Sequence, residues 1–436
     1  CTCGSRSFIK PPKPGNARQA LQDSARPAMT DRSGAARIRA GMGTKSTTKA
    51  KPATIAALAG ARAIPPLLIV LYHFSEGHHY SGVRLIDLIA TRGYLWAEFF
   101  FALSGFILTH VYAARTAALW TWKGYGGFLK ARLLRLYPLH LFLLLLLLGL
   151  VISTRLAGEI GGYASIYDRT YHPMVDAKGF VLSLFLVQGW NTLPYLTWNG
   201  VAWFVSVEFA LCLIFPVFLK LQDGKAWRGL GLIAAGIGGM MLLLANSRHG
   251  LDLTFHNGVL RGLADFSIGV GMAVLFRDAG ALAALPAWIH GVAQAALLAL
   301  LAYVFTQIGW SHTGNDLYMA LTLQAFVFAL AFDKGWLADL LKLRGPQVLG
   351  DWSYAVYLGQ TFWLQYMRVI EFRFYPPPDA IVLGGGLSRI PQLYARVPEI
   401  WKSSVFSERD SIVTKLCPPR FGDSSGVRGA AWLWPA

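Results

Sequence analysis

Apolar and polar residues alternate along the chain in long blocks, which is the pattern of helices that cross a membrane. The block over residues 133–152 is long enough to cross about 30 Å of hydrocarbon, because a helix rises about 1.5 Å per residue. The pattern predicts an all-α fold, a polytopic transmembrane helical bundle of about nine to ten spans. The long apolar blocks cover residues 55–74, 93–113, 133–153, 201–219, 229–246, 258–276, 286–308, 316–332 and 348–369.

A shorter block, FVLSLFLVQGW at 180–190, decides how the later spans are oriented. Its residues reach only about 16 Å as a helix, so we expect it to lie at the interface or to re-enter rather than to cross. The basic loops at 220–228 and 333–347 then fall on the same side as the basic N-terminus. This is the arrangement that the positive-inside rule favours, and it predicts a cytoplasmic N-terminus.

Composition supports the membrane class and excludes an ordinary soluble protein. Hydrophobic residues make up 54% of the 436 residues and charged residues 14%, too few to cover a soluble surface. The net charge is +17, but the basic residues sit mainly in the tails and short loops, so we expect membrane lipids rather than nucleic acid as partners. Cys1, Cys3, Cys212 and Cys417 form neither a disulfide framework nor a spaced metal site, and no metal is expected.

The two ends differ in composition from the middle. Residues 1–53 are polar and aperiodic, with eleven Lys or Arg against two Asp up to Lys51, and are predicted to be a disordered basic cytoplasmic tail. The chain opens with Cys rather than Met, as a fragment or an over-extended reading would, and Met42 would be a sensible start. No cleavable signal peptide is expected. Residues 54–370 are predicted to be the membrane domain, and 371–436 an irregular C-terminal tail for which an aberrant origin, such as a shifted reading frame, is left open.

Two ionisable residues lie in the first predicted span. Arg62 and His73 are eleven residues apart, which on one continuous helix places both on one face about 16 Å apart along the axis. One interpretation is structural: Arg62 snorkels to the headgroups and His73 is an interfacial histidine. The other is functional, because ionisable residues inside spans are costly.

Further charged residues lie in or next to other spans. Arg132 and Arg135 are three residues apart where the third span leaves the cytoplasm, so their guanidinium groups share a helix face and suit a phosphate-bearing ligand. The alternative is a basic anchor at the membrane edge. Glu208 lies deep in an apolar stretch and needs a partner from another helix, such as His73 or an arginine.

Taken in order, five stretches resemble the acyltransferase-3 family of integral membrane acyltransferases. They are Arg62 and His73 with ten residues between them, EFFFALSGF at 98–106, Arg132-Leu-Leu-Arg135, WFVSVEF at 203–209 with Pro216, and SYAVYL at 353–358. The resemblance covers about 57–365 and implies that the predicted membrane domain at 54–370 is a membrane acyltransferase domain. Each motif is weak alone, but five in the right order on plausible spans are specific.

The resemblance implies a ten-span fold that moves an acyl group, most often acetyl, from acyl-CoA to a hydroxyl of a carbohydrate or other small acceptor. It implies that His73 is the catalytic histidine and Arg62 its paired arginine. Arg132 and Arg135 match the donor-binding pair, and Glu208 matches the glutamate of the fourth motif. We predict an integral protein of the bacterial inner membrane, concerned with the cell envelope.

Chemistry suits these roles. An imidazole titrates near neutral pH, so His73 is the best candidate for the base that takes the hydroxyl proton, or for a carrier of the acyl group. Glu208 would orient His73 if the fold brings the two within hydrogen-bond reach. Arg62 would bind a phosphate or the thioester oxygen.

The chain also departs from the family pattern. Pro65 and Pro66 replace the usual small residues, and Gln360 stands where the family often has histidine. Two other functions remain open: a proton-coupled membrane transporter, which also needs intramembrane His, Arg and Glu, and a nonfunctional remnant of an acyltransferase.

Overall fold

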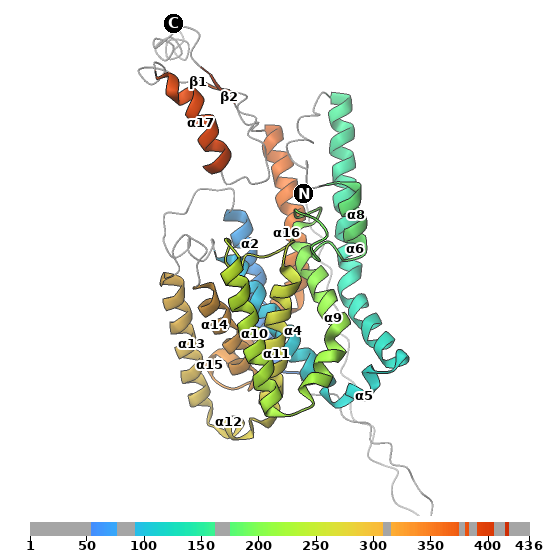
Figure 1. Cartoon of the computed structure of the whole chain (residues 1–436), viewed down its shortest axis with the longest axis vertical. Helices are drawn as coiled ribbons and strands as arrows, with labels where there is room; N and C mark the ends of the chain where they lie inside the picture. The colour runs from blue at the N-terminus through green and yellow to red at the C-terminus, as the bar shows by residue number, and fades with distance from the viewer. Residues whose placement is uncertain are drawn as a thin grey trace, which may run out of the picture. The chain divides into compact units, whose positions relative to one another are not determined.

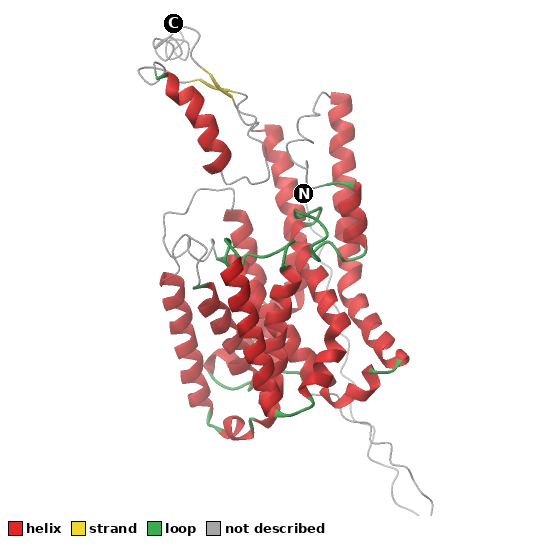
Figure 2. Ribbon diagram, in the orientation of Figure 1, coloured by secondary structure: helices red, strands yellow, loops and turns green. Residues whose placement is uncertain are grey.

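Helices make up most of the part of the chain that the computed structural model describes (Figure 2). The predicted disorder of residues 1–53 lies outside that part. The structure describes residues 54–75, 92–161, 175–307, 315–374, 380–382, 390–404 and 415–417.

The helices follow the apolar blocks of the sequence (Figure 1). In chain order they are α1 (Ala56–Ala61), α2 (Ile64–Ser75), η1 (Gly93–Leu95), α4 (Trp96–Tyr112), η2 (Ala113–Arg115), α5 (Thr116–Leu119), α6 (Trp122–Gly161), α8 (Ala177–Leu184), η3 (Gly200–Ala202), α9 (Trp203–Gln222), α10 (Ala226–Asn246), α11 (Gly258–Asp278), α12 (Gly280–Ala284), α13 (Ala287–Gln307), α14 (Asp316–Ala331), α15 (Trp336–Leu341), α16 (Arg344–Phe374) and α17 (Pro391–Ser404). Two short strands, β1 (Ala380–Val382) and β2 (Lys415–Cys417), pair in parallel.

Seven helices among the described residues are long and apolar enough to cross a membrane. The predicted count of nine to ten spans is therefore not confirmed. Two predicted spans account for the difference: α14 has only 16 residues, and α16, although 31 residues long, carries many polar side chains. The short block at 180–190 forms α8, whose eight residues end at Leu184 and are too few to cross.

The first span is broken close to its N-terminal end. α1 stops at Ala61, and α2 begins at Ile64 with Pro65 and Pro66 in its first turn. Proline is tolerated there because the N–H groups of the first turn have no helical acceptor. The break leaves Arg62 at the junction between two helices, so it does not share one continuous helix with His73.

α4 and α11 pack in the middle of the bundle, with α10, α9 and α14 around them (Figure 1). Their contact depends on two glycines that face the opposite backbone. A Cβ atom on Gly105 would meet the carbonyl of Phe266, and one on Gly269 would meet the carbonyl of Ala102. Small residues of this kind let two membrane helices approach closely.

We expect Gly269→Ala to destabilise the protein by about 1–3 kcal/mol, because the added methyl group would force α4 and α11 apart. Gly149→Ala in α6 is the matched control, since a Cβ there meets nothing within 4 Å. Thermal unfolding of the purified protein in detergent measures both. Equal melting temperatures for the two variants would contradict the close contact.

Candidate active site

Four of the predicted site residues line a single cavity of about 300 Å³, which we call the arginine cavity. They come from the α1–α2 junction, α6 and α9, and side chains from α4 and α16 close the remaining walls. Its polar lining residues are Thr54, Arg62, Ser104, His110, Arg132, Arg135, Glu208, Ser353, Tyr354 and Tyr357.

The arginines are held there by local contacts. Arg132 and Arg135 lie one turn apart on α6, and the guanidinium of Arg132 lies 6.0 Å from the ring centre of Tyr112. Arg62 donates to Ser353 Oγ at 3.4 Å. The positive charge of Arg135 also acts on Arg62. Among the described residues, none of the three arginines forms an ion pair. The cavity is therefore rich in positive charge.

Glu208 is the acid of this cavity. Its Oε1 accepts a hydrogen bond from Ser104 Oγ at 2.5 Å, and the charges of Arg132 and Arg135 act on it. Within the described residues, Glu208 Oε2 and Arg132 Nε are buried and have no hydrogen-bond partner. Buried polar atoms are rarely left unpaired, so water or a polar ligand would be expected to pair with both atoms.

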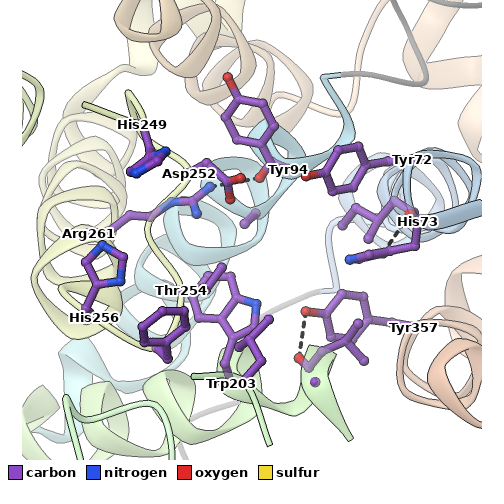
Figure 3. A pocket seen from close by; sticks show the side chains of 16 residues that line it. Tyr72, His73, Tyr94, Trp203, His249, Asp252, Thr254, His256, Arg261 and Tyr357 are labelled. Carbon is purple, nitrogen blue, oxygen red and sulfur yellow. Dashed lines mark hydrogen bonds between the residues drawn. The ribbon is translucent and has the colours of Figure 1, made fainter. Parts of the chain in front are cut away.

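His73 lies in a second cavity of about 230 Å³, which we call the histidine cavity (Figure 3). Aromatic side chains form much of its wall, and polar groups from the loop before α11 close one side. Its lining residues include Tyr72, His73, Tyr94, Trp203, His249, Asp252, Thr254, Phe255, His256, Arg261 and Tyr357. Tyr357 lines both cavities and donates to the carbonyl of Val201 at 2.9 Å.

The structure gives His73 a different partner from the one we predicted. His73 Nδ1 lies 3.0 Å from the carbonyl oxygen of Ile69 and 3.1 Å from Gln360 Oε1. No hydrogen bond joins His73 to Glu208 among the described residues, and the two line different cavities. The expected role of Glu208 in orienting His73 is therefore not what this geometry shows. Arg62 and His73 also line different cavities.

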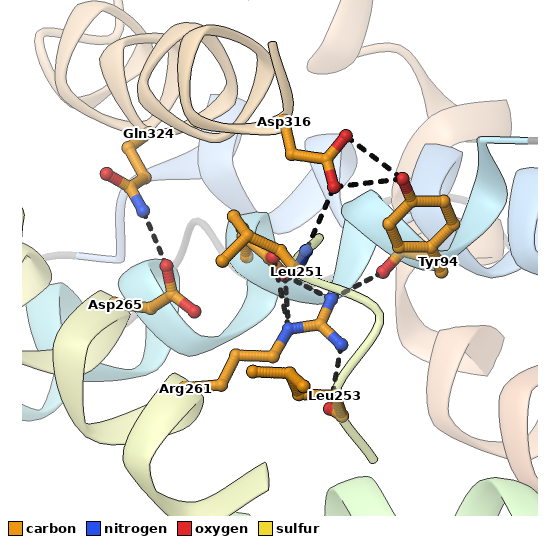
Figure 4. A network of polar contacts seen from close by, with 8 residues as sticks. Tyr94, Leu251, Leu253, Arg261, Asp265, Asp316 and Gln324 are labelled. Atoms are coloured by element: carbon orange, nitrogen blue, oxygen red, sulfur yellow. Dashed lines mark hydrogen bonds and ion pairs between the residues drawn. The ribbon is translucent and has the colours of Figure 1, made fainter. Parts of the chain in front are cut away.

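A buried ion pair supports the wall of the histidine cavity, and Figure 4 shows its arginine, Arg261, between Tyr94 and Leu253. Arg261 of α11 approaches Glu98 of α4 to 2.6 Å, and both side chains are almost fully buried. The same guanidinium donates to the carbonyls of Leu253 and Tyr94, at 3.0 Å and 2.8 Å. It also lies 5.4 Å from the ring centre of Trp203. The sequence motif at 98–106 includes Glu98, but the sequence analysis did not select Arg261, although an arginine inside an apolar block is itself a signal.

Comparison with known proteins settles the family. Residues 55–390 match the acyltransferase domain that defines the acyltransferase-3 group. The chain belongs to the acyltransferase-3 family. The predicted resemblance is thereby confirmed, and the protein is an acyltransferase that transfers groups other than aminoacyl groups. Together with its seven apolar helices, the match fits an integral membrane protein.

Two curated relatives match this acyltransferase region. Acyltransferase MdmB of Streptomyces mycarofaciens is 27% identical over 332 residues, which cover 71% of this chain and 79% of MdmB. Protein 2 in the picA locus of Rhizobium radiobacter is 31% identical over 167 residues, which cover 38% of this chain and 78% of that protein. No solved structure matches the chain significantly.

The C-terminal part matches a different family. Residues 369–436 match the ROK family. N-acetylgalactosamine kinase AgaK of Shewanella sp. (strain ANA-3) is 46% identical to this chain over 56 residues, which cover 13% of this chain and 18% of the kinase. The change in composition after residue 370 thus coincides with a change of family. The described elements of this part are β1, β2 and α17.

Proposed function

We propose that this membrane acyltransferase moves an acyl group, most simply acetyl, from acyl-CoA to a hydroxyl of a carbohydrate or other small acceptor. The observation that carries the proposal is the gathering of Arg62, Arg132 and Arg135 in one cavity that shares Tyr357 with the cavity of His73. Excess positive charge in the first cavity suits an anionic donor, and an imidazole in the second suits proton transfer.

The arginine cavity is the proposed donor site. The planar guanidinium groups of Arg132 and Arg135 would bind the phosphates of the donor, since arginine matches phosphate with paired N–H donors. The unpartnered Arg132 Nε adds a further donor. Arg62, at the helix junction, would bind another phosphate or the thioester oxygen.

The histidine cavity is the proposed acceptor site. Its aromatic rings, such as Trp203 and Tyr357, give apolar faces on which a sugar ring would pack. Its polar groups, such as Asp252 and Thr254, would form hydrogen bonds with hydroxyl groups. This mixture of aromatic and polar groups favours a carbohydrate over a purely apolar acceptor.

The chemistry follows from the two cavities. His73 would take the proton of the acceptor hydroxyl while the oxygen of that hydroxyl forms a bond to the carbonyl carbon of the thioester. The carbon–sulfur bond then breaks, and the proton passes from the imidazole to the departing thiolate. Arg62 would steady the negative charge that develops on the thioester oxygen.

We further propose that the arginine cavity faces the cytoplasm of a bacterial cell and that the protein resides in the inner membrane. Basic residues gather in the loops on the side of α5 and α12, which lie at one end of the bundle in Figure 1. The positive-inside rule assigns that end to the cytoplasm, where CoA thioesters are made.

Membranes containing the protein, incubated with acetyl-CoA radiolabelled in its acetyl group and with cell-envelope carbohydrate, test the function. Incorporation of label into the carbohydrate, which alkali releases as acetate, is the expected result. Uptake of label without transfer would indicate a carrier. The absence of both would indicate an inactive remnant.

We expect Arg132→Ala with Arg135→Ala to raise the donor KM by about 10- to 100-fold for each guanidinium, because a hydrogen bond to a charged group contributes about 1.5–3 kcal/mol. Lys130→Ala is the matched control, since Lys130 is exposed on the same helix and lines neither cavity. Initial rates at varied acetyl-CoA measure KM. An unchanged KM in the double variant would remove the arginines from the donor site.

A further inference from the structure

The imidazole of His73 is held at one nitrogen by two oxygen atoms. Nδ1 lies 3.0 Å from the carbonyl of Ile69, one turn earlier on α2, and 3.1 Å from Gln360 Oε1 on α16. A carbonyl oxygen can only accept a hydrogen bond. Two acceptors at one ring nitrogen require that nitrogen to carry the proton, which leaves the lone pair on Nε2.

The orientation of the Gln360 amide is itself fixed. Its Nε2 donates to the carbonyl of Tyr357 at 2.8 Å, and the side chain is buried. Rotating the amide by half a turn would bring two carbonyl oxygens together at Tyr357 and present an N–H group to the proton on His73 Nδ1. The observed orientation is the one that satisfies both contacts, so the oxygen faces His73.

The other ring nitrogen of His73 is turned toward the acceptor site. Figure 3 shows the end of the ring remote from its hydrogen bond pointing into the histidine cavity. Gln360 does not line either cavity, so it acts on the reaction only through His73.

We propose that Gln360 is a positioning residue that keeps the proton of His73 on Nδ1 and thereby presents Nε2 as the base for the acceptor hydroxyl. The inference rests on the proposed acyl transfer. During that transfer the hydroxyl proton moves to Nε2 and then to the departing thiolate, while the Nδ1 proton stays in place. Gln360 accepts a hydrogen bond from Nδ1 in the neutral ring and in the imidazolium alike.

Other ionisable groups line the cavity of His73 and titrate as the pH changes. The pH profile of each variant must therefore be compared with that of the wild type, which carries the same groups. They lie on α2, η1, α11, α16 and the loop before α11. These groups are Tyr72, Tyr94, His249, Asp252, His256, Arg261 and Tyr357.

Two substitutions at Gln360 separate positioning from packing. Gln360→Met keeps the approximate volume and removes the acceptor, while Gln360→Glu keeps an oxygen facing Nδ1 and adds a negative charge. Gln222→Met is the matched control, because Gln222 is also buried, accepts one hydrogen bond from Gly224 N and lines neither cavity. The kcat, the donor KM and the pH dependence of kcat/KM are measured with acetyl-CoA and cell-envelope carbohydrate.

We expect Gln360→Met to lower kcat by about 10- to 100-fold, less than the loss of the whole base, because the Ile69 carbonyl still holds Nδ1. Its donor KM should stay close to that of the wild type. Gln360→Glu should retain most of kcat and move the acidic limb of the pH profile upward by about one pH unit, because a carboxylate beside the ring favours the imidazolium. Gln222→Met should resemble the wild type in all three quantities.

The outcomes separate this inference from the proposed function. A wild-type protein without acyl transfer would refute the proposed function first. With an active wild type, an unchanged kcat in Gln360→Met, or a pH profile of Gln360→Glu that coincides with the wild type, would overturn the role of Gln360. If the methionine variant does not fold, the glutamate profile alone decides.

Discussion

Replacing His73 with alanine is expected to abolish acyl transfer, with kcat lower by about 10²–10⁴-fold, the usual contribution of a general base. The donor KM should remain close to the wild-type value, because His73 lines the histidine cavity and not the arginine cavity. Rates at varied acetyl-CoA, with insertion checked in the membrane fraction, measure both quantities. A loss of kcat without a change in donor KM would place His73 in the chemical step.

The matched control is His290→Gln. His290 lies on α13, with Nε2 3.1 Å from the carbonyl of Leu282, and lines neither cavity. Activity of His73→Ala near that of the wild type would remove the histidine from the mechanism.

A single-turnover experiment on the intact wild-type protein separates the two roles proposed for His73. An acyl group trapped on His73 would identify a carrier, whereas acyl transfer without a trapped acyl group would favour a base.

Glu98→Gln is expected to lower the free energy of unfolding by about 3–5 kcal/mol, the usual cost of breaking a buried ion pair. The amide keeps the shape of the side chain but leaves the charge of Arg261 uncompensated inside the bundle. The two groups are 1% and 0% exposed, so water cannot replace the lost contact. Unfolding of the purified protein by increasing SDS in mixed micelles measures the change.

An exposed pair provides the comparison. Asp223 and Arg228 are 3.6 Å apart with side chains 60% and 34% exposed, and a surface pair of this kind contributes about 0–1 kcal/mol. Asp223→Asn is therefore expected to have little effect. Adding Arg261→Met to Glu98→Gln should recover part of the lost stability, since it removes the stranded charge. Equal stabilities for Glu98→Gln and Asp223→Asn would contradict the importance of the buried pair.

The sequence predicted the membrane helices well because a long apolar block leaves few alternatives to a helix in hydrocarbon. It also selected the residues of the arginine cavity, since Arg62, Arg132, Arg135 and Glu208 do line one space. It overestimated the number of spans, because α14 is shorter than a span and α16 carries many polar side chains among its apolar ones.

The sequence did not predict which polar groups meet. The prediction that Arg62 and His73 lie on one helix face assumed a single continuous helix. In the structure α1 ends at Ala61 and α2 begins at Ile64. A pairing such as His73 with Gln360 joins residues 287 positions apart, and no local pattern indicates it. The same holds for Glu98 and Arg261, 163 positions apart. Such contacts depend on how whole helices pack against one another, and local patterns in a single sequence do not reveal that packing.

The position of Tyr357 on both cavities bears on how the two proposed substrates would reach each other. If each cavity holds its own substrate, neither the highly charged nucleotide nor the hydroxyl-rich sugar has to enter hydrocarbon, where a charge at the midplane is expensive. Under the proposed function, only the acyl group would pass from one cavity to the other, and it would do so as part of the bond exchange. Tyr357, which lines both cavities, would then mark the place where the two substrates meet.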